Sequence, residues 1–262
     1  MWLQIQCKFS FTITGDTPLV LMLRPRSGPN QWITKEEYRI EPFHPVVEFT
    51  DLYGNLCQRL VAKEGPLIIE HSAKVKAPKS LPNGKGEPFI PVQNLPYEVL
   101  QYLLPSRYCE SDRFGQMAAS ITQGYNLGYD QVEAIKNYIL ENFRYEPGSS
   151  IVPLSAVEVN AKDYAVCRDM AHLGIALCRG LAIPARIVVG YLHELEPMDL
   201  HAWFEAYVGD QWYTFDATQT ELRGGYVAVG YGRDAADVAI YNQFGPLTYH
   251  DSQTISVERI EE

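Results

Sequence analysis

Residues 201–216 read His-Ala-Trp-Phe-Glu-Ala-Tyr-Val-Gly-Asp-Gln-Trp-Tyr-Thr-Phe-Asp, a pattern typical of two strands joined by a tight turn. If the Gly-Asp pair at 209–210 forms the whole loop, counting outward pairs Trp203 with Asp216. His201 then lies on the same face as Asp216, as its diagonal neighbour, so that an imidazole and a carboxylate can approach each other. The stretch therefore predicts a histidine–aspartate pair on an antiparallel sheet.

The same register divides the remaining side chains of the hairpin between two faces. One face carries apolar side chains and should pack on a core: Ala202, Phe204, Ala206, Tyr213 and Phe215. The face that carries His201 is more polar, and we expect it to form the wall of a cleft, with these members: Trp203, Glu205 and Trp212.

A helix is predicted upstream, from Cys167 to Arg179, with Gly180 as a favoured residue past its end. It is apolar almost all round and should be buried. Cys167 begins the helix, where partial positive charge and free N–H groups stabilise a thiolate, whereas Cys178 lies at the unfavourable end. Cys167 is thus the candidate nucleophile. We interpret three of the other cysteines as small buried apolar residues: Cys7, Cys57 and Cys178. For Cys109, the choice between a buried apolar residue and a reactive thiol stays open.

A thiol nucleophile needs a general base within hydrogen-bond reach and a third group to orient that base. His172 follows Cys167 by five residues on the same predicted helix, a rotation of roughly 140° that turns it away from the thiol. The surroundings of the other histidines outside the hairpin are typical of ordinary surface or core side chains: His44, His71, His193 and His250. His201 is therefore the candidate base and Asp216 its candidate orienting group.

Three blocks of sequence follow one another in the second half of the chain: Cys167-Arg-Asp-Met-Ala-His, Gly180-Leu-Ala-Ile-Pro-Ala-Arg with Val189-Gly-Tyr, and His201-Ala-Trp-Phe-Glu with Trp212-Tyr-Thr-Phe-Asp-Ala-Thr. In this order they resemble the core of the transglutaminase-like superfamily, papain-related enzymes with a Cys, His, Asp triad. The resemblance implies that Cys167 is the nucleophile, His201 the base and Asp216 its orienter. Segments 51–55, 106–112 and 230–237 look like the bacterial branch, which has an N-terminal transglutaminase-associated β-domain.

The backbone N–H of Cys167, at the start of its helix, is a natural oxyanion donor for a tetrahedral intermediate. Tyr164 is a candidate second donor, with a packing aromatic as the alternative interpretation. Arg233 lies between acidic residues in segment 232–237, and we interpret it as one partner of a structural ion pair; the alternative is that it braces the cleft or a substrate charge.

The chain changes character near residue 77. Before it, extended runs follow one another without a helical period, which predicts an all-β sandwich: 3–13, 19–23, 37–40, 46–50, 56–61 and 67–75. Residues 77–96 are rich in proline and indicate a domain boundary. The fold class is therefore α+β: a β-sandwich with its linker over 1–95, then a papain-like transglutaminase core over 96–262. Further elements are expected in the core, helices at 98–104 and 130–143 and strands at 185–192, 226–231 and 254–259.

Composition narrows the class of protein further. The 262 residues carry a net charge of −10, which disfavours nucleic acid and anionic membranes as partners. No run is apolar enough to span a bilayer and the N-terminus does not resemble a signal peptide, so we expect a cytoplasmic location. The five scattered cysteines contain no CxxC pair, and neither a metal nor an organic cofactor is implied.

These observations predict thiol-dependent acyl transfer on a peptide or carboxamide bond of a protein or peptide substrate. With water as acceptor the enzyme would be a cysteine protease or amidase, and with an amine it would be a transamidase. The alternative is a catalytically silent protein-binding module on the same scaffold, because triad residues are necessary for activity and not sufficient.

Overall fold

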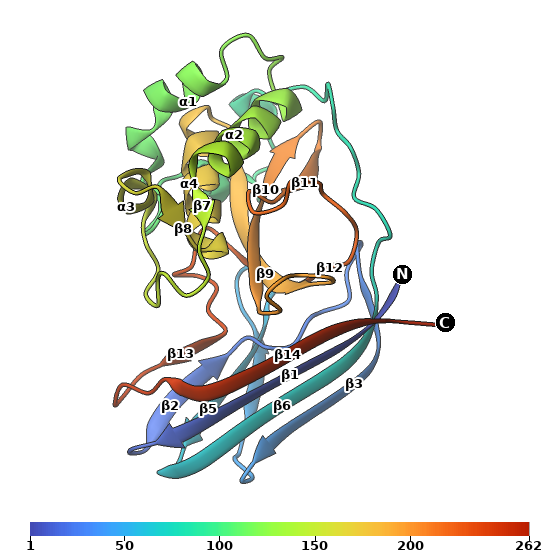
Figure 1. Ribbon diagram of the computed structural model, residues 1–262, viewed down its shortest axis with the longest axis vertical. Coiled ribbons are helices and arrows are strands. Elements are labelled where there is room, and N and C mark those ends of the chain that lie inside the picture. Colours follow the sequence, from blue (N-terminus) through green and yellow to red (C-terminus); the bar gives the residue numbers. More distant parts are fainter. Residues whose placement is uncertain (262) are drawn as a thin grey trace.

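The computed structural model describes residues 1–261, and a β-sandwich forms the lower half of the molecule in Figure 1. One of its sheets has the strand order β14-β1-β6-β3 and the other β13-β2-β5-β4. The strands are β1 (Trp2–Ile13), β2 (Thr17–Leu21), β3 (Trp32–Glu41), β4 (Val47–Thr50), β5 (Leu56–Ala62), β6 (Gly65–Lys76), β13 (Tyr241–Gln243) and β14 (His250–Ile260).

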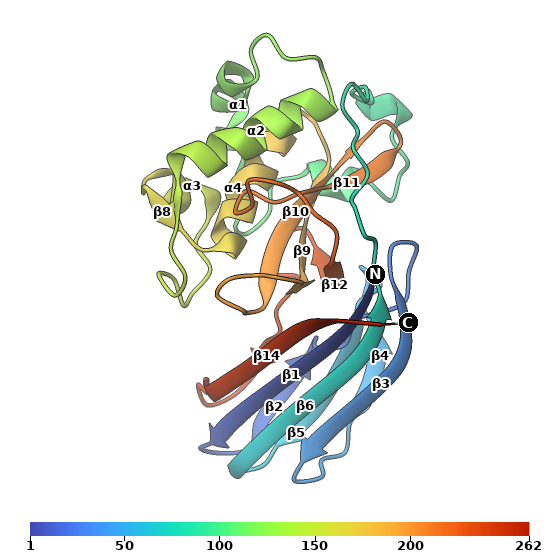
Figure 2. The same cartoon turned by 45° about the vertical axis from the view of Figure 1, so that its right-hand side comes forward.

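Strand β1 shows why this segment folds as a sheet. Its apolar side chains alternate with polar ones, and the apolar set is buried while the other set faces outward. Both edges of β1 are paired, one with β6 and the other with β14 (Figure 2). The inward side chains form the centre of the sandwich core: Leu3, Ile5, Cys7, Phe9, Phe11 and Ile13.

The last two strands of the chain lie in the β-sandwich, which differs from the division expected from the sequence. The sequence predicts that everything from residue 96 onward belongs to the core, whereas β13 pairs with β2 and β14 pairs with β1 along ten residue pairs. The chain therefore leaves the sandwich, builds the core and returns. Strand periodicity indicates which face of a strand is buried but not which strand is its neighbour, so the return could not be read from residues 250–260.

The α+β core forms the upper half of the molecule (Figures 1 and 2). A four-stranded antiparallel sheet has the order β11-β10-β9-β12, and helix α4 packs on it. The sheet strands are β9 (Ala185–Leu192), β10 (His201–Val208), β11 (Gln211–Phe215) and β12 (Tyr226–Gly232). The other elements are α1 (Gly115–Ile121), α2 (Tyr129–Asn142), α3 (Ala156–Asn160), α4 (Cys167–Gly180), the short strands β7 (Arg144–Tyr145) and β8 (Tyr164–Ala165), and 3₁₀ helices at Val92–Asn94, Leu100–Leu103 and Ser111–Arg113.

The helix expected over 98–104 is only a 3₁₀ turn at Leu100–Leu103. The segment is short because a proline stands on each side of it, at positions 96 and 105. The expected helices at 130–143 and 167–179 are confirmed as α2 and α4. Within the described chain, no helix is long and apolar enough to cross a membrane.

A glycine sets the distance between α4 and the sheet. A Cβ on Gly174 would lie 2.6 Å from the ring of Phe204, which stacks in turn on Phe215. Only a residue without a side chain lets the helix approach β10 this closely. The close approach brings the first turn of α4 to the end of the sheet where β10 begins.

Two side-chain amides of the sandwich bind the edge strand of the core sheet. Gln31 donates to the carbonyl of Ala228 and accepts from its N–H, both at 2.8 Å. Asn55 donates to the carbonyl of Tyr231 at 2.7 Å and accepts from its N–H at 2.8 Å. Each amide thus replaces the backbone partner that an additional strand would offer to β12, and the pairing ties the sandwich to the core sheet.

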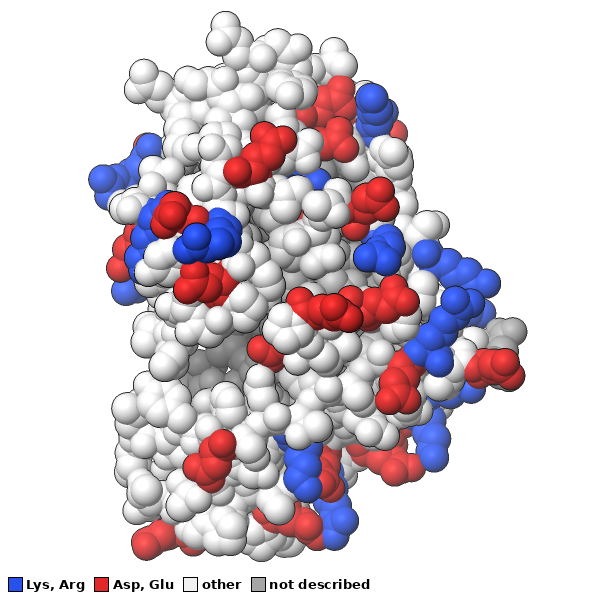
Figure 3. Space-filling model, viewed as in Figure 1, with Lys and Arg blue, Asp and Glu red and all other residues white. Residues whose placement is uncertain are grey.

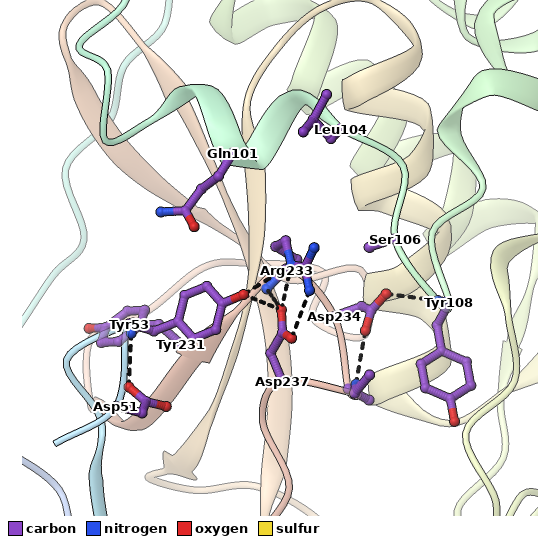
Figure 4. Close-up of polar contacts among 12 residues, drawn as sticks. Asp51, Tyr53, Gln101, Leu104, Ser106, Tyr108, Tyr231, Arg233, Asp234 and Asp237 are labelled. Carbon is purple, nitrogen blue, oxygen red and sulfur yellow. Dashed lines mark hydrogen bonds and ion pairs between the residues drawn. The ribbon is translucent and has the colours of Figure 1, made fainter. Parts of the chain in front are cut away.

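A second contact between the two halves centres on Arg233, as Figure 4 shows. Its guanidinium donates to the hydroxyl of Tyr53 at 2.9 Å and to the carboxylate of Asp237 at 2.8 Å. The structural ion pair expected for Arg233 is confirmed. Its carbonyl accepts from the buried Arg179 of α4 at 2.7 Å, so the same residue joins the sandwich turn, the 232–237 segment and α4.

On the face in Figure 3, acidic and basic side chains lie next to one another in several separate clusters. The same face is hollowed between the upper, helical part of the molecule and the β-sandwich below it.

Candidate active site

The β10–β11 hairpin has the register counted from the sequence. Val208 pairs with Gln211 and Phe204 pairs with Phe215, so the next pair outward is Trp203 with Asp216. The two loop residues at 209–210 both have positive φ, 54° and 63°, which is the conformation of a type I′ turn. The turn fixes the register, and the register brings His201 and Asp216 to one end of the hairpin.

His201 and Asp216 form a buried hydrogen-bonded pair. The distance between His201 Nε2 and Asp216 Oδ2 is 2.6 Å, and each residue is only 1% exposed. The other carboxylate oxygen, Oδ1, accepts from the backbone N–H of Thr218 at 2.9 Å and from its hydroxyl at 2.8 Å. Four donors in total surround this carboxylate, since the hydroxyl of Tyr226 also donates to Oδ2, at 2.9 Å.

Cys167 is the first residue of α4 and is half-buried, unlike the other cysteines. Its backbone N–H belongs to the first turn of the helix, where N–H groups have no acceptor within the helix and are available as donors. Asp169, in the first turn of the helix, anchors the loop that precedes α3: its carboxylate accepts from the backbone N–H of Leu154 at 3.1 Å and from Arg168 of its own turn at 2.9 Å. The nucleophile candidate therefore lies at an anchored helix start.

The electrostatic environment favours a charged His201. Burial lowers the pKa of the imidazole, but the charge and hydrogen bond of Asp216 and the contact with the Cys167 thiol outweigh burial and raise this pKa to about 10. For Asp216, burial raises the pKa of the carboxyl, and the stronger effect of His201 and Thr218 lowers it below its usual value. His201 Nδ1 has no hydrogen-bond partner among residues 1–261, so this nitrogen remains for the thiol.

We expect the stability of the protein to depend on pH through this pair. The folded state holds the His201 proton more tightly than the unfolded chain, so its contribution is complete below the unfolded pKa of 6.5 and is lost as the pH rises towards 10. The pKa of Asp216 is depressed, so its contribution is present above 3.8 and is lost as the pH falls through the folded value. Urea unfolding of the wild type should therefore show the largest stability excess over His201→Gln between about pH 4 and 6.5. An excess that stays constant up to pH 10 would contradict the assigned charges.

The face expected to form an open cleft wall is packed. Trp203 is 2% exposed and meets the ring of Tyr226 edge to face at 5.0 Å. Glu205 is 7% exposed and accepts from Arg186 Nη2 at 2.6 Å, and this guanidinium stacks on the ring of Trp212 at 4.1 Å. The prediction of a cleft wall is therefore wrong for Trp203 and Glu205, because a half-buried arginine and the aromatic rings cover that face. Trp212 is half-buried.

The short parallel pair β7–β8 argues against Tyr164 as the second oxyanion donor. Side chains alternate along a strand, so Tyr164 and the buried Ala165 point to opposite sides, and the ammonium of Lys162 lies 5.4 Å from the Tyr164 ring. Tyr145 pairs with Ala165 and shares its side. Burial, followed by the charges of Cys167, Asp199 and Asp216, raises the pKa of Tyr145. The charge of Cys167 therefore acts on Tyr145, which makes Tyr145 the better candidate for the second donor.

His172, which the helical rotation excludes as the base, has a structural environment. It is fully buried, its Nδ1–H donates to the carbonyl of Leu154 at 2.8 Å, and Nε2 accepts from the N–H of Ala235 at 3.2 Å. The Tyr108 ring stacks on it at 5.2 Å. Burial lowers the pKa of this imidazole, which is consistent with a neutral core histidine.

Sequence reasoning missed Tyr226 and Tyr145. Tyr145 stands in β7, which pairs with β8 over only two residue pairs. Tyr226 stands in β12, whose partner β9 is distant in sequence, and β12 has a bulge between Ala228 and Gly230 that no sequence pattern reveals. A polar aromatic at the start of the otherwise apolar strand β12 was the one available signal. Among the described residues, no group of three or more His, Cys, Asp or Glu could hold a metal ion.

Comparison with known proteins connects this geometry to a family. The transglutaminase-like superfamily model matches residues 115–217, which contain Cys167, His201 and Asp216. A solved structure from Cytophaga hutchinsonii, described as a candidate cysteine protease, is 32% identical, has a TM-score of 0.93, and is matched over 100% of this chain and 91% of its own. The chain belongs to the transglutaminase-like superfamily.

Two curated relatives of this transglutaminase-like protein are uncharacterised. One, from Mycobacterium leprae, is 27% identical over 234 residues, which cover 83% of this chain and 82% of the relative. The other, YebA of Bacillus subtilis, is 26% identical over 150 residues, which cover 45% of this chain and 20% of that protein. The comparisons thus show the superfamily and its α+β fold.

Proposed function

We propose that this protein is a thiol-dependent acyl-transfer enzyme that acts on peptide or carboxamide bonds through Cys167, His201 and Asp216. The observation that carries the proposal is the buried pair of His201 and Asp216, 2.6 Å apart, beside a half-buried cysteine at the start of a helix. A buried ion pair is costly to maintain, and such pairs with strongly shifted pKa values concentrate at functional sites.

The two imidazole nitrogens have separate tasks in this mechanism. Nε2 is engaged by Asp216, so Nδ1 is the nitrogen that exchanges a proton with the Cys167 thiol. Transfer of the thiol proton to Nδ1 leaves a thiolate on Cys167, which the partial positive charge of the α4 N-terminus stabilises. The thiolate attacks the substrate carbonyl, and the carbonyl oxygen becomes an oxyanion.

Two groups are available to stabilise that oxyanion. The first is the backbone N–H of Cys167 at the helix start, as the sequence predicts. The second in this proposal is the hydroxyl of Tyr145 instead of Tyr164, because Tyr145 shares a side with Ala165, two residues before the nucleophile. The Tyr145 hydroxyl stays protonated, and therefore a donor, since burial and the charge of Cys167 raise its pKa.

Collapse of the intermediate completes the acyl transfer. The C–N bond breaks, His201 gives its proton to the leaving amine, and the acyl group remains on Cys167 as a thioester. His201 then takes a proton from water or from a primary amine, which attacks the thioester and regenerates the thiol. Water as acceptor gives hydrolysis and an amine gives transamidation, and the proposed substrate is a protein or peptide. The cytoplasmic location stays a prediction.

A peptide library with and without a primary amine tests the proposed function. Wild-type protein is incubated with the library, and mass spectrometry records peptides that are cleaved, deamidated or joined to the amine. The proposal predicts products with the wild type and none with Cys167→Ala. Equal product patterns for both proteins, or no products with a wild type that binds library members, would favour the silent binding module instead.

Selective alkylation is expected at Cys167. Brief exposure to iodoacetamide at neutral pH should label this residue well before the other cysteines, because all four of those are buried. Burial raises the pKa of Cys7 and of Cys57 to about 11, and it raises the pKa of Cys109 and Cys178 as well. Peptide mapping gives the order of labelling, and His201→Ala should slow the reaction at Cys167. If Cys109 reacted first and Cys167 only after unfolding, the thiol would be structural.

A further inference from the structure

We propose that Tyr226 is a positioning residue of this site, whose hydroxyl holds the Asp216 carboxylate in the orientation that His201 requires. This inference rests on the proposed function for its catalytic consequence, but its geometry is independent of the substrate. Asp216 Oδ2 accepts two hydrogen bonds, from His201 Nε2 at 2.6 Å and from the Tyr226 hydroxyl at 2.9 Å. The tyrosine therefore binds the same oxygen that binds the histidine.

The carboxylate is held from both ends. Thr218 supplies two donors to Oδ1, its backbone N–H at 2.9 Å and its hydroxyl at 2.8 Å. Without Tyr226, His201 alone would hold Oδ2, and His201 is the group that must change protonation during the reaction. Tyr226 is the donor at Oδ2 that does not take part in proton transfer, so it can keep the carboxylate in place while the imidazole exchanges its proton.

Burial keeps water from taking over this task. Asp216 is 1% exposed and Tyr226 is 7% exposed. Burial and the negative charge of Asp216 raise the pKa of Tyr226, so its hydroxyl remains a donor. A buried carboxylate that loses one donor without replacement keeps an unsatisfied lone pair, which is costly in a dry environment.

The Tyr226 ring has a fixed position. It meets Trp203 edge to face at 5.0 Å and lies 6.5 Å from the imidazole of His201. Tyr226 begins β12, which pairs with β9 on one side and receives the Gln31 and Asn55 amides of the β-sandwich farther along. The position of the hydroxyl is thus fixed by the packing of its ring on Trp203 and by the strand β12, which is bonded to β9 on one side and to the sandwich on the other.

Tyr226→Phe tests the proposal, with Tyr191→Phe as its matched control. Tyr191 is a buried tyrosine on the adjacent strand, paired with Val227, and its hydroxyl donates to the carbonyl of Leu23 at 3.3 Å, away from the site. Both variants lose one hydroxyl from the same sheet. With a substrate from the library, Tyr226→Phe should lower kcat about tenfold and leave KM unchanged, whereas Tyr191→Phe should leave both unchanged.

A spectroscopic measurement tests the same bond without any substrate. The proton shared by His201 and Asp216 should give a downfield imidazole N–H resonance in proton NMR, and Tyr226→Phe should shift it because Oδ2 has lost its second donor. Tyr191→Phe should not shift it.

The outcomes separate the inference from the proposed function. An unshifted resonance in Tyr226→Phe, or a kcat equal to that of Tyr191→Phe, would overturn the positioning role. A shifted resonance in a protein without any turnover would support the role of Tyr226 and contradict the proposed acyl transfer instead.

Discussion

Asp216→Asn is expected to lower turnover about 10⁴-fold while the protein still folds, because the histidine would be held in the wrong tautomer. The surroundings of the side chain decide how an amide would lie. The Thr218 backbone N–H can only donate, so the amide oxygen must take the position of Oδ1. The amide NH₂ then faces His201 Nε2, which has to become an acceptor.

That tautomer removes the base from the mechanism. With Nε2 as acceptor, the ring proton lies on Nδ1, the nitrogen that must take the proton from Cys167. Tyr226 can adapt, since its hydroxyl can turn to avoid the NH₂, but Thr218 and His201 cannot both be satisfied in the active form. Turnover should therefore approach that of Cys167→Ala.

Asp234→Asn is the matched control for this substitution. Asp234 is likewise 1% exposed, and it accepts from the backbone N–H groups of Tyr108 at 2.7 Å and Ala236 at 2.8 Å, outside the candidate triad. It should lower the melting temperature and leave turnover per folded molecule within a few-fold of wild type. Turnover of Asp216→Asn within tenfold of wild type would contradict the role of His201 as the base.

A fragment that begins at Pro96 is expected to be insoluble. It keeps the three candidate triad residues and β14, but it lacks β1, which pairs with β14 over ten residue pairs. An edge strand without its partner offers unpaired backbone groups to other chains. Removal of the sandwich would also expose side chains of the core sheet that lie in the sandwich core: Tyr191, Val227 and Val229.

A second fragment separates the effect of unpaired strands from the effect of an exposed apolar surface. A fragment spanning 96–240 omits β13 and β14 and so carries neither orphan strand. We expect it to remain aggregation-prone, since Tyr191 and the two valines stay uncovered, but less so than 96–262. Sedimentation and alkylation of Cys167 in both fragments measure this. A soluble, labelled 96–262 fragment would show that the sandwich is an independent attachment.

The local part of the site followed from the sequence because a two-residue turn couples neighbouring strands directly. The Gly-Asp loop at 209–210 adopts the positive φ values of a type I′ turn, and this alone sets Trp203 opposite Asp216. The position of Cys167 at a helix start followed from the apolar run after it, which indicates a buried helix, and from Gly180, which marks the end of that helix. Each of these inferences spans fewer than 20 residues, a range over which backbone geometry determines the outcome.

The fate of the polar face of the hairpin was decided by residues far from it. Alternation correctly separated the core face of β10 from the other face, but Glu205 is covered by Arg186 from the neighbouring strand, and Arg186 is covered by the Trp212 and Tyr231 rings. The alternation of apolar and polar residues indicates that this face does not belong to the main core, but it does not indicate which residues pack on it.

What the sequence determined by itself is most of the longer strands, helices α2 and α4, the hairpin register and, through three motifs, the superfamily. Only the tertiary structure decided that β14 returns to pair with β1, that Tyr226 shares Asp216 with His201, and that Gln31 and Asn55 hold the strand on which Tyr226 lies. Periodicity along one strand carries no information about its partner, because hydrogen bonds between strands join backbone groups that every residue possesses. Contacts between such distant segments are selected by the packing of the whole chain.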